Sequence, residues 1–324
     1  MDTMGIVGAG AFGTALALAL SSRGREMHLY SDLPAVAQTI NMLHLNPQFL
    51  PGIGLPLHCM GQDTLATAPD CKILFLSVPA QAIRSVCESL HRIPKTTPVI
   101  VCSKGIEASS GLCMGELAAS LLPNPVLMLS GPSFAQEISR GLPTIVTLAG
   151  EENELLASLQ ESLETPAFRI EPCLDPIGVQ VGGALKNMLA VGGGLVLGAG
   201  LGEDARAVLI ARGFQEMQRI VQRLGGNPDT LLGMAGLGDV LLTCMSNTSR
   251  NTTFGIRVAR REITVPLTPS AQGPLAEGAL TAAGWPVFQK RIAPVETPIL
   301  TAIHEALYAN RSFAEVFAAL LSHP

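Results

Sequence analysis

The first half of the chain alternates short runs of β-branched and other apolar residues with longer stretches that have helical periodicity. This alternation is typical of a parallel sheet covered by helices on both faces. We expect strands over Met4–Val7, Met27–Tyr30, Ile73–Val78, Val99–Cys102, Val126–Leu129 and Thr144–Leu148. We expect helices over Phe12–Ser22, Gln81–Leu90, Leu112–Leu121 and Glu152–Leu163. The N-terminal half is therefore predicted to be a doubly wound α/β domain.

Near Asp175-Pro176 the strand-length runs stop, and longer stretches with helical periodicity take over. The clearest one carries apolar residues at alternating spacings of four and three, namely Ile210, Phe214, Met217, Val221 and Leu224. This stripe predicts a helix that faces the core or a second subunit, and Gly225-Gly226 is expected to end it. Its opposite face carries Arg219, Gln222 and Arg223 and is expected to face solvent.

The length of 324 residues exceeds what one hydrophobic core usually organises, so two domains are expected. We place a doubly wound domain with a parallel sheet at residues 1–177 and an all-helical domain at residues 178–324. Hydrophobic residues make up 48% of the chain, which is enough to supply a core to both domains.

Composition excludes several classes of protein. The formal net charge of −5 and the aromatic content of 4% argue against a nucleic-acid-binding protein, because basic and stacking side chains are both scarce. An anionic ligand must therefore be bound by a local site. The seven cysteines are odd in number and contain no Cys-x-x-Cys pair, which argues against a disulfide framework and a zinc site. We expect no metal and a reducing, cytoplasmic environment.

Two apolar segments resemble targeting or membrane sequences. Gly5–Ser22 is as apolar as a signal peptide, but it follows Asp2 rather than a basic stretch and lacks a convincing cleavage site. Asn187–Gly202 is uncharged, but glycines interrupt it and its 16 residues fall short of the ~20 that a spanning helix needs. We therefore expect no integral membrane segment.

A glycine motif, Gly8-Ala9-Gly10-Ala11-Phe12-Gly13, directly follows the first expected strand and opens a helix. In this context the first glycine permits a tight turn, the second lets a pyrophosphate approach the backbone, and the third lets helix and strand pack closely. The helix N-terminus would then donate free N–H groups to the pyrophosphate. The predicted cofactor contacts here are Gly8, Gly10, Ala11, Phe12 and Gly13.

Two further residues follow expected strands and point to the cofactor. Asp32 stands 19 residues after Gly13, where a carboxylate can accept hydrogen bonds from the ribose hydroxyls of NAD and repel the 2′-phosphate of NADP. NAD is therefore the preferred cofactor, although Asp32 can also be read as a helix cap or turn residue. Lys104 follows the fourth expected strand, and its position alone does not distinguish a ligand contact from a solvated loop lysine.

Three blocks identify a family: Gly183-Ala184-Leu185-Lys186-Asn187, Gly236-Leu237-Gly238-Asp239 and Ser249-Arg250-Asn251. Together with Leu50-Pro51-Gly52-Ile53 and Ala276-Glu277-Gly278, they make the chain similar, over nearly its whole length, to the NAD(P)-dependent glycerol-3-phosphate dehydrogenases of bacterial type. The resemblance implies a Rossmann-type domain followed by a helical substrate domain. It also implies a cytosolic homodimer that interconverts dihydroxyacetone phosphate and sn-glycerol 3-phosphate, a phosphopolyol, for phospholipid synthesis.

The resemblance also implies roles for individual residues. Lys186 corresponds to the proton donor and acceptor at the substrate oxygen. The implied substrate contacts are Lys104, Gly131, Ser133, Asn187, Asp239 and Thr243, with Ser249, Arg250 and Asn251 at the phosphate. The implied cofactor contacts outside the glycine motif are Lys104, Ala135, Arg250, Leu275 and Glu277.

Hydride transfer to or from a phosphorylated substrate requires the residue types found at Lys186 and Arg250. Hydride transfer at a secondary carbinol needs a group that removes the hydroxyl proton and returns it in the reverse direction. A lysine, with an ordinary pKa of about 10.4, does this near neutral pH only if it is desolvated or lies beside positive charge, which Lys104 could supply. The alternative reading of Lys186 is a lysine that extends to solvent. Arg250 suits phosphate because a guanidinium offers several fixed donors.

The sequence departs from the family pattern at three places. Glu203-Asp204 replaces an amide before the long helix, Thr252-Thr253 replaces basic residues after the phosphate group, and Asp32 stands where many members carry Arg or His. Two other functions remain as alternatives: a dehydrogenase of the β-hydroxyacid and 6-phosphogluconate group, and a nicotinamide-binding sensor without turnover.

Overall fold

The computed structural model describes residues 3–22, 24–246, 248–263, 265, 276–309 and 311–321. The chain divides into two compact units. Unit 1 consists of Met1–Ser103 and Met114–Pro176, and unit 2 consists of Lys104–Cys113 and Ile177–Pro324. The division differs from the predicted one because Lys104–Cys113, expected in the first domain, has its contacts in the helical unit.

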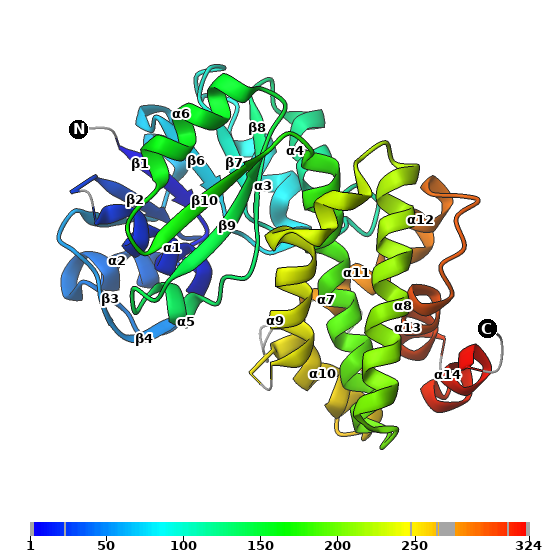
Figure 1. Cartoon of the computed structure of the whole chain (residues 1–324). Coiled ribbons are helices and arrows are strands. Elements are labelled where there is room, and N and C mark those ends of the chain that lie inside the picture. Colours follow the sequence, from blue (N-terminus) through cyan, green and yellow to red (C-terminus); the bar gives the residue numbers. More distant parts are fainter. Residues whose placement is uncertain are drawn as a thin grey trace. The chain divides into compact units, whose positions relative to one another are not determined.

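Unit 1 contains an eight-stranded sheet in the order β10-β9-β8-β7-β6-β1-β2-β5 (Figure 1). Its strands are β1 (Met4–Val7), β2 (Met27–Tyr30), β5 (Cys59–Gln62), β6 (Ile73–Leu76), β7 (Val99–Val101), β8 (Val126–Ser130), β9 (Thr144–Ala149) and β10 (Phe168–Cys173). A separate hairpin is formed by β3 (Leu45–Asn46) and β4 (Leu50–Gly54). The order in which strands are added to the sheet reverses at β1, which pairs in parallel with both β2 and β6.

The six expected strands are all present, two of them with the predicted bounds. The expected parallel sheet contains one antiparallel pair, β8 and β9. The connection between these strands contains α5 (Ala135–Ile138), which has only four residues. Such a helix is about 6 Å long and does not carry the chain back along the sheet as a parallel crossover requires.

The other helical segments of unit 1 surround its core. They are α1 (Ala11–Ser21), α2 (Pro34–Leu43), η1 (Leu65–Asp70), η2 (Ala80–Ala82), α3 (Ile83–Ser89), α4 (Met114–Leu121) and α6 (Asn153–Leu163). All four residues of β1 and all four of β2 are buried, as expected for strands covered on both faces. The apolar side of α1 packs on these strands through Leu16 and Leu20, which places the glycine motif at their carboxyl ends.

Unit 2 is helical, as predicted, among the residues that the structure describes. Its segments are α7 (Pro176–Gly198), α8 (Gly202–Arg223), η3 (Pro228–Leu232), η4 (Met234–Gly238), α9 (Asp239–Met245), α10 (Arg250–Ala259), α11 (Glu277–Ala283), α12 (Trp285–Arg291), α13 (Pro298–Tyr308) and α14 (Phe313–Leu321). The apolar stripe of α8 faces the core through Met217 and Val221, and Gly225, with φ of 88°, follows the helix end. The opposite face of α8 is exposed at Arg219, Gln222 and Arg223, as expected.

The central helix of unit 2 is α7, which continues through Gly192, Gly193 and Gly194 without a break. These glycines permit close contact between helices: a Cβ built on Gly194 would lie 2.1 Å from the carbonyl oxygen of Thr252 in α10. By length and composition α7 is apolar enough to cross a membrane, but 89% of its most apolar window is buried inside the fold. It is therefore the core helix of unit 2 and gives no clear membrane segment.

Candidate active site

In unit 1 the glycine motif forms a tight turn between β1 and α1. Gly8 has φ of +109°, and a Cβ at this position would lie 2.5 Å from the carbonyl oxygen of Ser77. A Cβ on Gly13 would lie 2.0 Å from the carbonyl oxygen of Gly8, whereas a Cβ on Gly10 would meet nothing within 4 Å. No side chain among the described residues caps the N-terminus of α1. An open glycine at an uncapped helix N-terminus fits a pyrophosphate, so the residues present fit a dinucleotide.

Asp32 is exposed and lies two residues beyond β2, at the same sheet edge as the glycine motif. In the turn that leads into α2, the Oγ of Ser31 accepts a hydrogen bond of 3.1 Å from the N–H of Leu33, and the N-cap residue Leu33 has no side-chain capping hydrogen bond within the described part of the chain. Asp32 therefore lies in this turn and does not cap α2. Of the basic residues near β2, Arg25 precedes the strand, whereas Arg23 is outside the described residues.

The expected contacts Gly131, Ser133 and Ala135 follow β8 in unit 1. Gly131 has φ of +145°, and a Cβ there would lie 3.1 Å from the Cα of Val146. The hydroxyl of Ser133 donates a 2.9 Å hydrogen bond to the carbonyl oxygen of Gly131. Ala135 begins α5 and packs on the same core as Phe12 of the glycine motif. Unit 1 thus holds all the expected contacts from Gly8 to Asp32 and from Gly131 to Ala135.

In unit 2 a cluster of charged side chains surrounds Asp239. One carboxylate oxygen, Oδ1, lies 2.6 Å from Nζ of Lys186, and the other, Oδ2, lies 2.6 Å from Nζ of Lys104. Lys186 also donates a 2.8 Å hydrogen bond to Oγ1 of Thr243, which lies 3.3 Å from Oδ1. The side chains of Asp239, Lys186 and Lys104 are 1%, 9% and 15% exposed. These four residues, which we call the lysine cluster, contain four of the expected substrate contacts or catalytic groups.

Local structure explains how α9 places the side chains of Asp239 and Thr243 beside Lys186. The two residues are four positions apart on one helix, so their side chains share the face that meets α7. The π-helical turn η4 directly precedes Asp239, and its Gly236 lies so close to η3 that a Cβ would be 2.0 Å from the carbonyl oxygen of Leu231. A Cβ on Gly182 of α7 would lie 2.7 Å from the carbonyl oxygen of Ala235. Small residues on both sides therefore let α9 approach Lys186 closely.

Lys104 reaches the lysine cluster from a segment anchored in unit 2. Ile106 and Cys113 pair as a β-bridge and lie in the core of this unit. Gly111 packs against the backbone of Phe288 in α12, where a Cβ would be 2.9 Å from the amide nitrogen, and its carbonyl oxygen accepts a hydrogen bond from Arg291. The solvated-loop reading of Lys104 is thus at odds with a side chain held beside Asp239.

Both causes expected to lower the pKa of Lys186, desolvation and a neighbouring positive charge, act in the lysine cluster. Burial lowers the pKa of Lys186 to about 8, Asp239 opposes this shift, and the neighbouring charge of Lys104 adds to it. Burial alone would raise the pKa of Asp239, but the two lysines hold it below its ordinary value. Lys104 therefore acts on Lys186 as expected, while desolvation is the larger cause. The two ammonium groups outnumber the one carboxylate, so the fully ionised cluster carries one net positive charge.

A second network joins three helices beside Lys186. The side-chain nitrogen of Asn251 donates to Oδ1 of Asn187 at 3.0 Å, and its Oδ1 accepts from the N–H of Gly278 at 2.9 Å. Asn251 thereby links α10 with α7 and with the first turn of α11, where Glu277 lies. Among the expected contacts, Asn187, Asn251 and Glu277 are therefore brought into one neighbourhood. Leu275 lies outside the described residues.

The start of α10 combines capping with an exposed cation. Ser249 is the N-cap, and its Oγ accepts a 3.3 Å hydrogen bond from the N–H of Thr252. Arg250 is the first helical residue and is exposed. Thr252, one of the departures from the family pattern, is buried and donates through its hydroxyl to the carbonyl oxygen of Thr243 at 3.1 Å. No pattern in the sequence predicts this role of Thr252, which ties α10 to the helix that carries Asp239.

Another of the three departures lies in the first turn of α8. Glu203 and Asp204 are exposed there, and a carboxylate oxygen of Glu203 lies 2.5 Å from Nη2 of the buried Arg206. Acidic side chains at this position favour the helix dipole. Glu203 and Asp204 thus have a structural explanation that involves no ligand.

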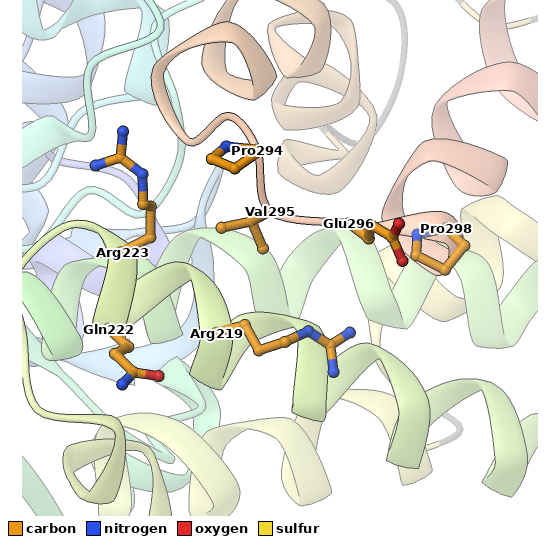
Figure 2. Close-up of a pocket in the computed structure, with 7 residues that line it drawn as sticks. All are labelled: Arg219, Gln222, Arg223, Pro294, Val295, Glu296 and Pro298. Carbon is orange, nitrogen blue, oxygen red and sulfur yellow. The ribbon is translucent and has the colours of Figure 1, made fainter.

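A surface pocket of about 700 Å³ lies between α8 and the segment before α13 (Figure 2). Its lining residues are Arg219, Gln222, Arg223, Pro294, Val295, Glu296 and Pro298. Arg223 is held at one side by a 3.0 Å hydrogen bond from its Nε to the carbonyl oxygen of Ala293. The pocket shares no residue with the lysine cluster and is therefore not part of the candidate active site.

Comparison with known proteins assigns the family. A family model described as the N-terminus of NAD-dependent glycerol-3-phosphate dehydrogenase matches residues 3–156, and one described as its C-terminus matches residues 175–318. The chain belongs to the NAD-dependent glycerol-3-phosphate dehydrogenase family. This membership decides against the β-hydroxyacid and 6-phosphogluconate group as its family.

Individual members of the glycerol-3-phosphate dehydrogenase family are similar over the full chain. The protein named glycerol-3-phosphate dehydrogenase (NAD(P)+) from Zymomonas mobilis is 43% identical over 326 residues, which cover 99% of this chain and 93% of the relative. The one from Methylobacterium radiotolerans is 42% identical and covers 98% of this chain and 96% of the relative. The crystal structure of glycerol-3-phosphate dehydrogenase from Coxiella burnetii has a TM-score of 0.91, with 31% identity and 99% of each chain covered.

Proposed function

We propose that the chain catalyses the reversible, NAD(P)-dependent interconversion of dihydroxyacetone phosphate and sn-glycerol 3-phosphate. The observation that carries this proposal is the lysine cluster: a buried Lys186, with a pKa of about 8, bonded to Asp239 and Thr243 in a member of this family. The relatives are named for this reaction and for NAD(P)+. Residues 1–177 are proposed to bind the dinucleotide and residues 178–324, together with the loop that starts at Lys104, to bind the substrate.

The proposed chemistry needs one group that moves a proton. A bound nicotinamide supplies the hydride for reduction and accepts it in oxidation. Lys186 donates a proton to the ketone oxygen during reduction and removes it from the hydroxyl during oxidation. Thr243 and Asp239 hold Nζ of Lys186 in place, and the positive charge of Lys104 stabilises the negative charge that develops on the substrate oxygen. Burial keeps water away from the proton that is transferred.

The pH dependence should differ between the two directions. For oxidation of glycerol 3-phosphate, kcat/KM should rise with pH through about 8, because Lys186 must be neutral to accept the proton. For reduction of dihydroxyacetone phosphate, kcat/KM should fall through the same pH, because the protonated form is lost. Initial rates measured in both directions from pH 6 to 10 check this. Lys104→Met should move both inflections upward, since the Lys104 charge lowers the Lys186 pKa; profiles with the same slope in both directions would contradict the role.

The phosphate of the substrate is proposed to bind at the start of α10. The helix N-terminus, the hydroxyl of Ser249 and the exposed guanidinium of Arg250 provide donors and positive charge there. Asn187 and Asn251 lie nearby and are proposed to bind the polyol, while Gly131 and Ser133 of unit 1 are proposed as further substrate contacts.

Arg250→Ala should raise KM for dihydroxyacetone phosphate roughly 10- to 100-fold, because a charge-assisted contact to phosphate is lost. The kcat/KM for unphosphorylated dihydroxyacetone should change little. Arg257→Ala, which removes a partly exposed cation near the other end of the same helix, is the matched control. An equal loss of kcat/KM for both substrates would assign Arg250 to the fold or to the cofactor instead.

Asp32 is proposed to favour NADH over NADPH, because its carboxylate follows β2 and would repel a 2′-phosphate. Asp32→Arg should raise the ratio of kcat/KM for NADPH to that for NADH by about tenfold or more, since a guanidinium pairs with the added phosphate. Asp70→Arg makes the same charge change at an exposed residue before β6, at the opposite sheet edge, and should leave the ratio unchanged. A native preference for NADPH would refute the role of Asp32.

The remaining cofactor contacts are proposed at the glycine motif, Ala135, Glu277, Lys104 and Arg250, with Leu275 proposed from sequence alone. The chain is further proposed to be a cytoplasmic homodimer that feeds glycerophospholipid synthesis. One assay tests the central proposal: purified protein should oxidise NADH or NADPH only when dihydroxyacetone phosphate is present. Cofactor binding without turnover would support the sensor alternative instead.

A further inference from the structure

We propose that Asn46 is a positioning residue for cofactor binding, which orients the backbone of the glycine motif from outside that motif. The inference rests on the proposed dinucleotide site of unit 1. Asn46 ends the short strand β3, and no ligand needs to touch it for this role. The β3–β4 hairpin packs against α1 and α2 and lies beside them in Figure 1.

The carboxamide of Asn46 makes two short hydrogen bonds in a buried environment. Its Nδ2 donates to the carbonyl oxygen of Ala9 at 2.8 Å and to Oγ1 of Thr14 at 2.8 Å. The hydroxyl of Thr14 lies 3.3 Å from the same carbonyl oxygen, to which it donates. Asn46 and Thr14 are each 1% exposed, and Ala9 is 3% exposed. Both N–H groups of the amide are therefore engaged in hydrogen bonds, one to the loop before α1 and one to the first turn of α1.

The direction of the Ala9 carbonyl determines the direction of the next N–H group. The peptide bond is planar and trans, so the carbonyl of Ala9 and the N–H of Gly10 point to opposite sides. Because Asn46 holds the carbonyl oxygen in the interior, the N–H of Gly10 faces away from the hairpin. A Cβ on Gly10 would meet nothing within 4 Å, so this side of the loop is open. Asn46 thus fixes the orientation of the N–H of Gly10, which would donate a hydrogen bond to a pyrophosphate.

The hairpin itself is fixed independently of the glycine motif. The N–H of Leu55 donates to the carbonyl oxygen of His44 at 2.7 Å, and the N–H of Phe49 donates to the carbonyl oxygen of Asn46 at 3.3 Å. Leu50 and Leu55 are buried in the core of unit 1. The side chain of Asn46 is therefore presented by a rigid element rather than by a loose loop.

Asn46→Asp tests the inference, because it keeps the shape of the side chain and removes both donated protons. The Kd for NADH should rise about tenfold or more, since a carboxylate repels the Ala9 carbonyl oxygen and frees the peptide to turn. The KM for NADH should rise with it, whereas KM for dihydroxyacetone phosphate and kcat at saturating NADH should not. Isothermal titration with NADH, in the absence of substrate, gives the Kd directly.

Asn124→Asp is the matched control. Asn124 is 8% exposed, lies in unit 1, and its Nδ2 also donates to two carbonyl oxygens, those of Pro94 and Thr97, at 2.8 and 2.9 Å. It precedes β8 and so lies at the amino-terminal edge of the sheet, whereas the glycine motif follows β1. This variant should bind NADH within about twofold of the wild type while losing similar thermal stability.

Thr14→Val provides a milder second variant, which decides the question if Asn46→Asp does not fold. It removes one acceptor of Asn46 and one donor to Ala9, so the Kd for NADH should rise roughly threefold or more. An unchanged Kd in the Asn46 variant, or an equal rise in the Asn124 variant, would overturn the role of Asn46 alone. A wild-type protein that bound neither NADH nor NADPH would overturn the proposed function as well.

Discussion

Lys186→Met should lower kcat for dihydroxyacetone phosphate reduction by roughly 10²- to 10⁴-fold, the usual contribution of general acid–base catalysis. The substitution removes the ammonium group that lies 2.6 Å from Asp239 and 2.8 Å from Thr243. Methionine keeps most of the side-chain volume, so the 9%-exposed position in α7 stays filled. Steady-state kinetics at saturating NADH and substrate measure the loss of kcat.

Cofactor binding separates a catalytic role of Lys186 from a structural one. The glycine motif belongs to unit 1 and Lys186 to unit 2, so the Kd for NADH should stay within about twofold of the wild type. Lys290→Met, at an exposed position in the last turn of α12, is the matched control and should retain wild-type kcat. Near-normal kcat in a folded Lys186→Met protein would refute the assignment.

Asp239→Asn should reduce both activity and the stability of unit 2. It leaves two ammonium groups, 9% and 15% exposed, without their shared carboxylate. Breaking a buried ion pair by removing one partner costs about 3–5 kcal/mol of unfolding free energy. Trp285 is the one tryptophan of the chain and is fully buried in unit 2, so its fluorescence during urea unfolding reports this loss.

Asp239→Asn should also shift the pH dependence of kcat/KM in a defined direction. The negative charge of Asp239 opposes the downward shift of the Lys186 pKa. Removing this charge should therefore move the inflection of kcat/KM from about 8 to a lower pH. This is the opposite of the shift expected for Lys104→Met. Thr243→Val, which removes the two hydrogen bonds of this hydroxyl and no charge, should cost about 1–2 kcal/mol. A stability loss of Asp239→Asn no larger than that of Thr243→Val would mean that the ion pairs contribute little.

Several features could be predicted from the sequence because they depend on neighbours along the chain. Runs of buried apolar residues identify β1 and β2 with their observed bounds, since strands covered on both faces contain little else. The strand–glycine–helix order identifies the cofactor loop, and the period of the apolar stripe identifies α8. The proposal that Lys186, Asp239 and Arg250 are functional residues came from the family resemblance.

Other elements were missed because their local signal is weak. The strand β5 reads Cys-Met-Gly-Gln and β10 contains Pro172, so neither is a run of β-branched residues. Both form because a neighbouring strand, β2 or β9, offers free edge groups with which they pair. The antiparallel direction of β9 likewise follows from the short connection through α5 rather than from any residue in the strand.

The sequence by itself determined the two-part architecture, the glycine turn and the types of residue available for catalysis. Only the tertiary structure decided how these residues act on one another. Lys104 and Lys186 are 135 and 53 positions from Asp239 along the chain, yet each lies 2.6 Å from one of its oxygens. Charge interaction and desolvation depend on distance and burial in space, which no local pattern encodes. For the same reason, three sets of contacts could be identified only from the tertiary structure. They are the ion pairs of both lysines with Asp239, the hydrogen bond of Thr252 to Thr243 and the hydrogen bond of Asn46 to Ala9.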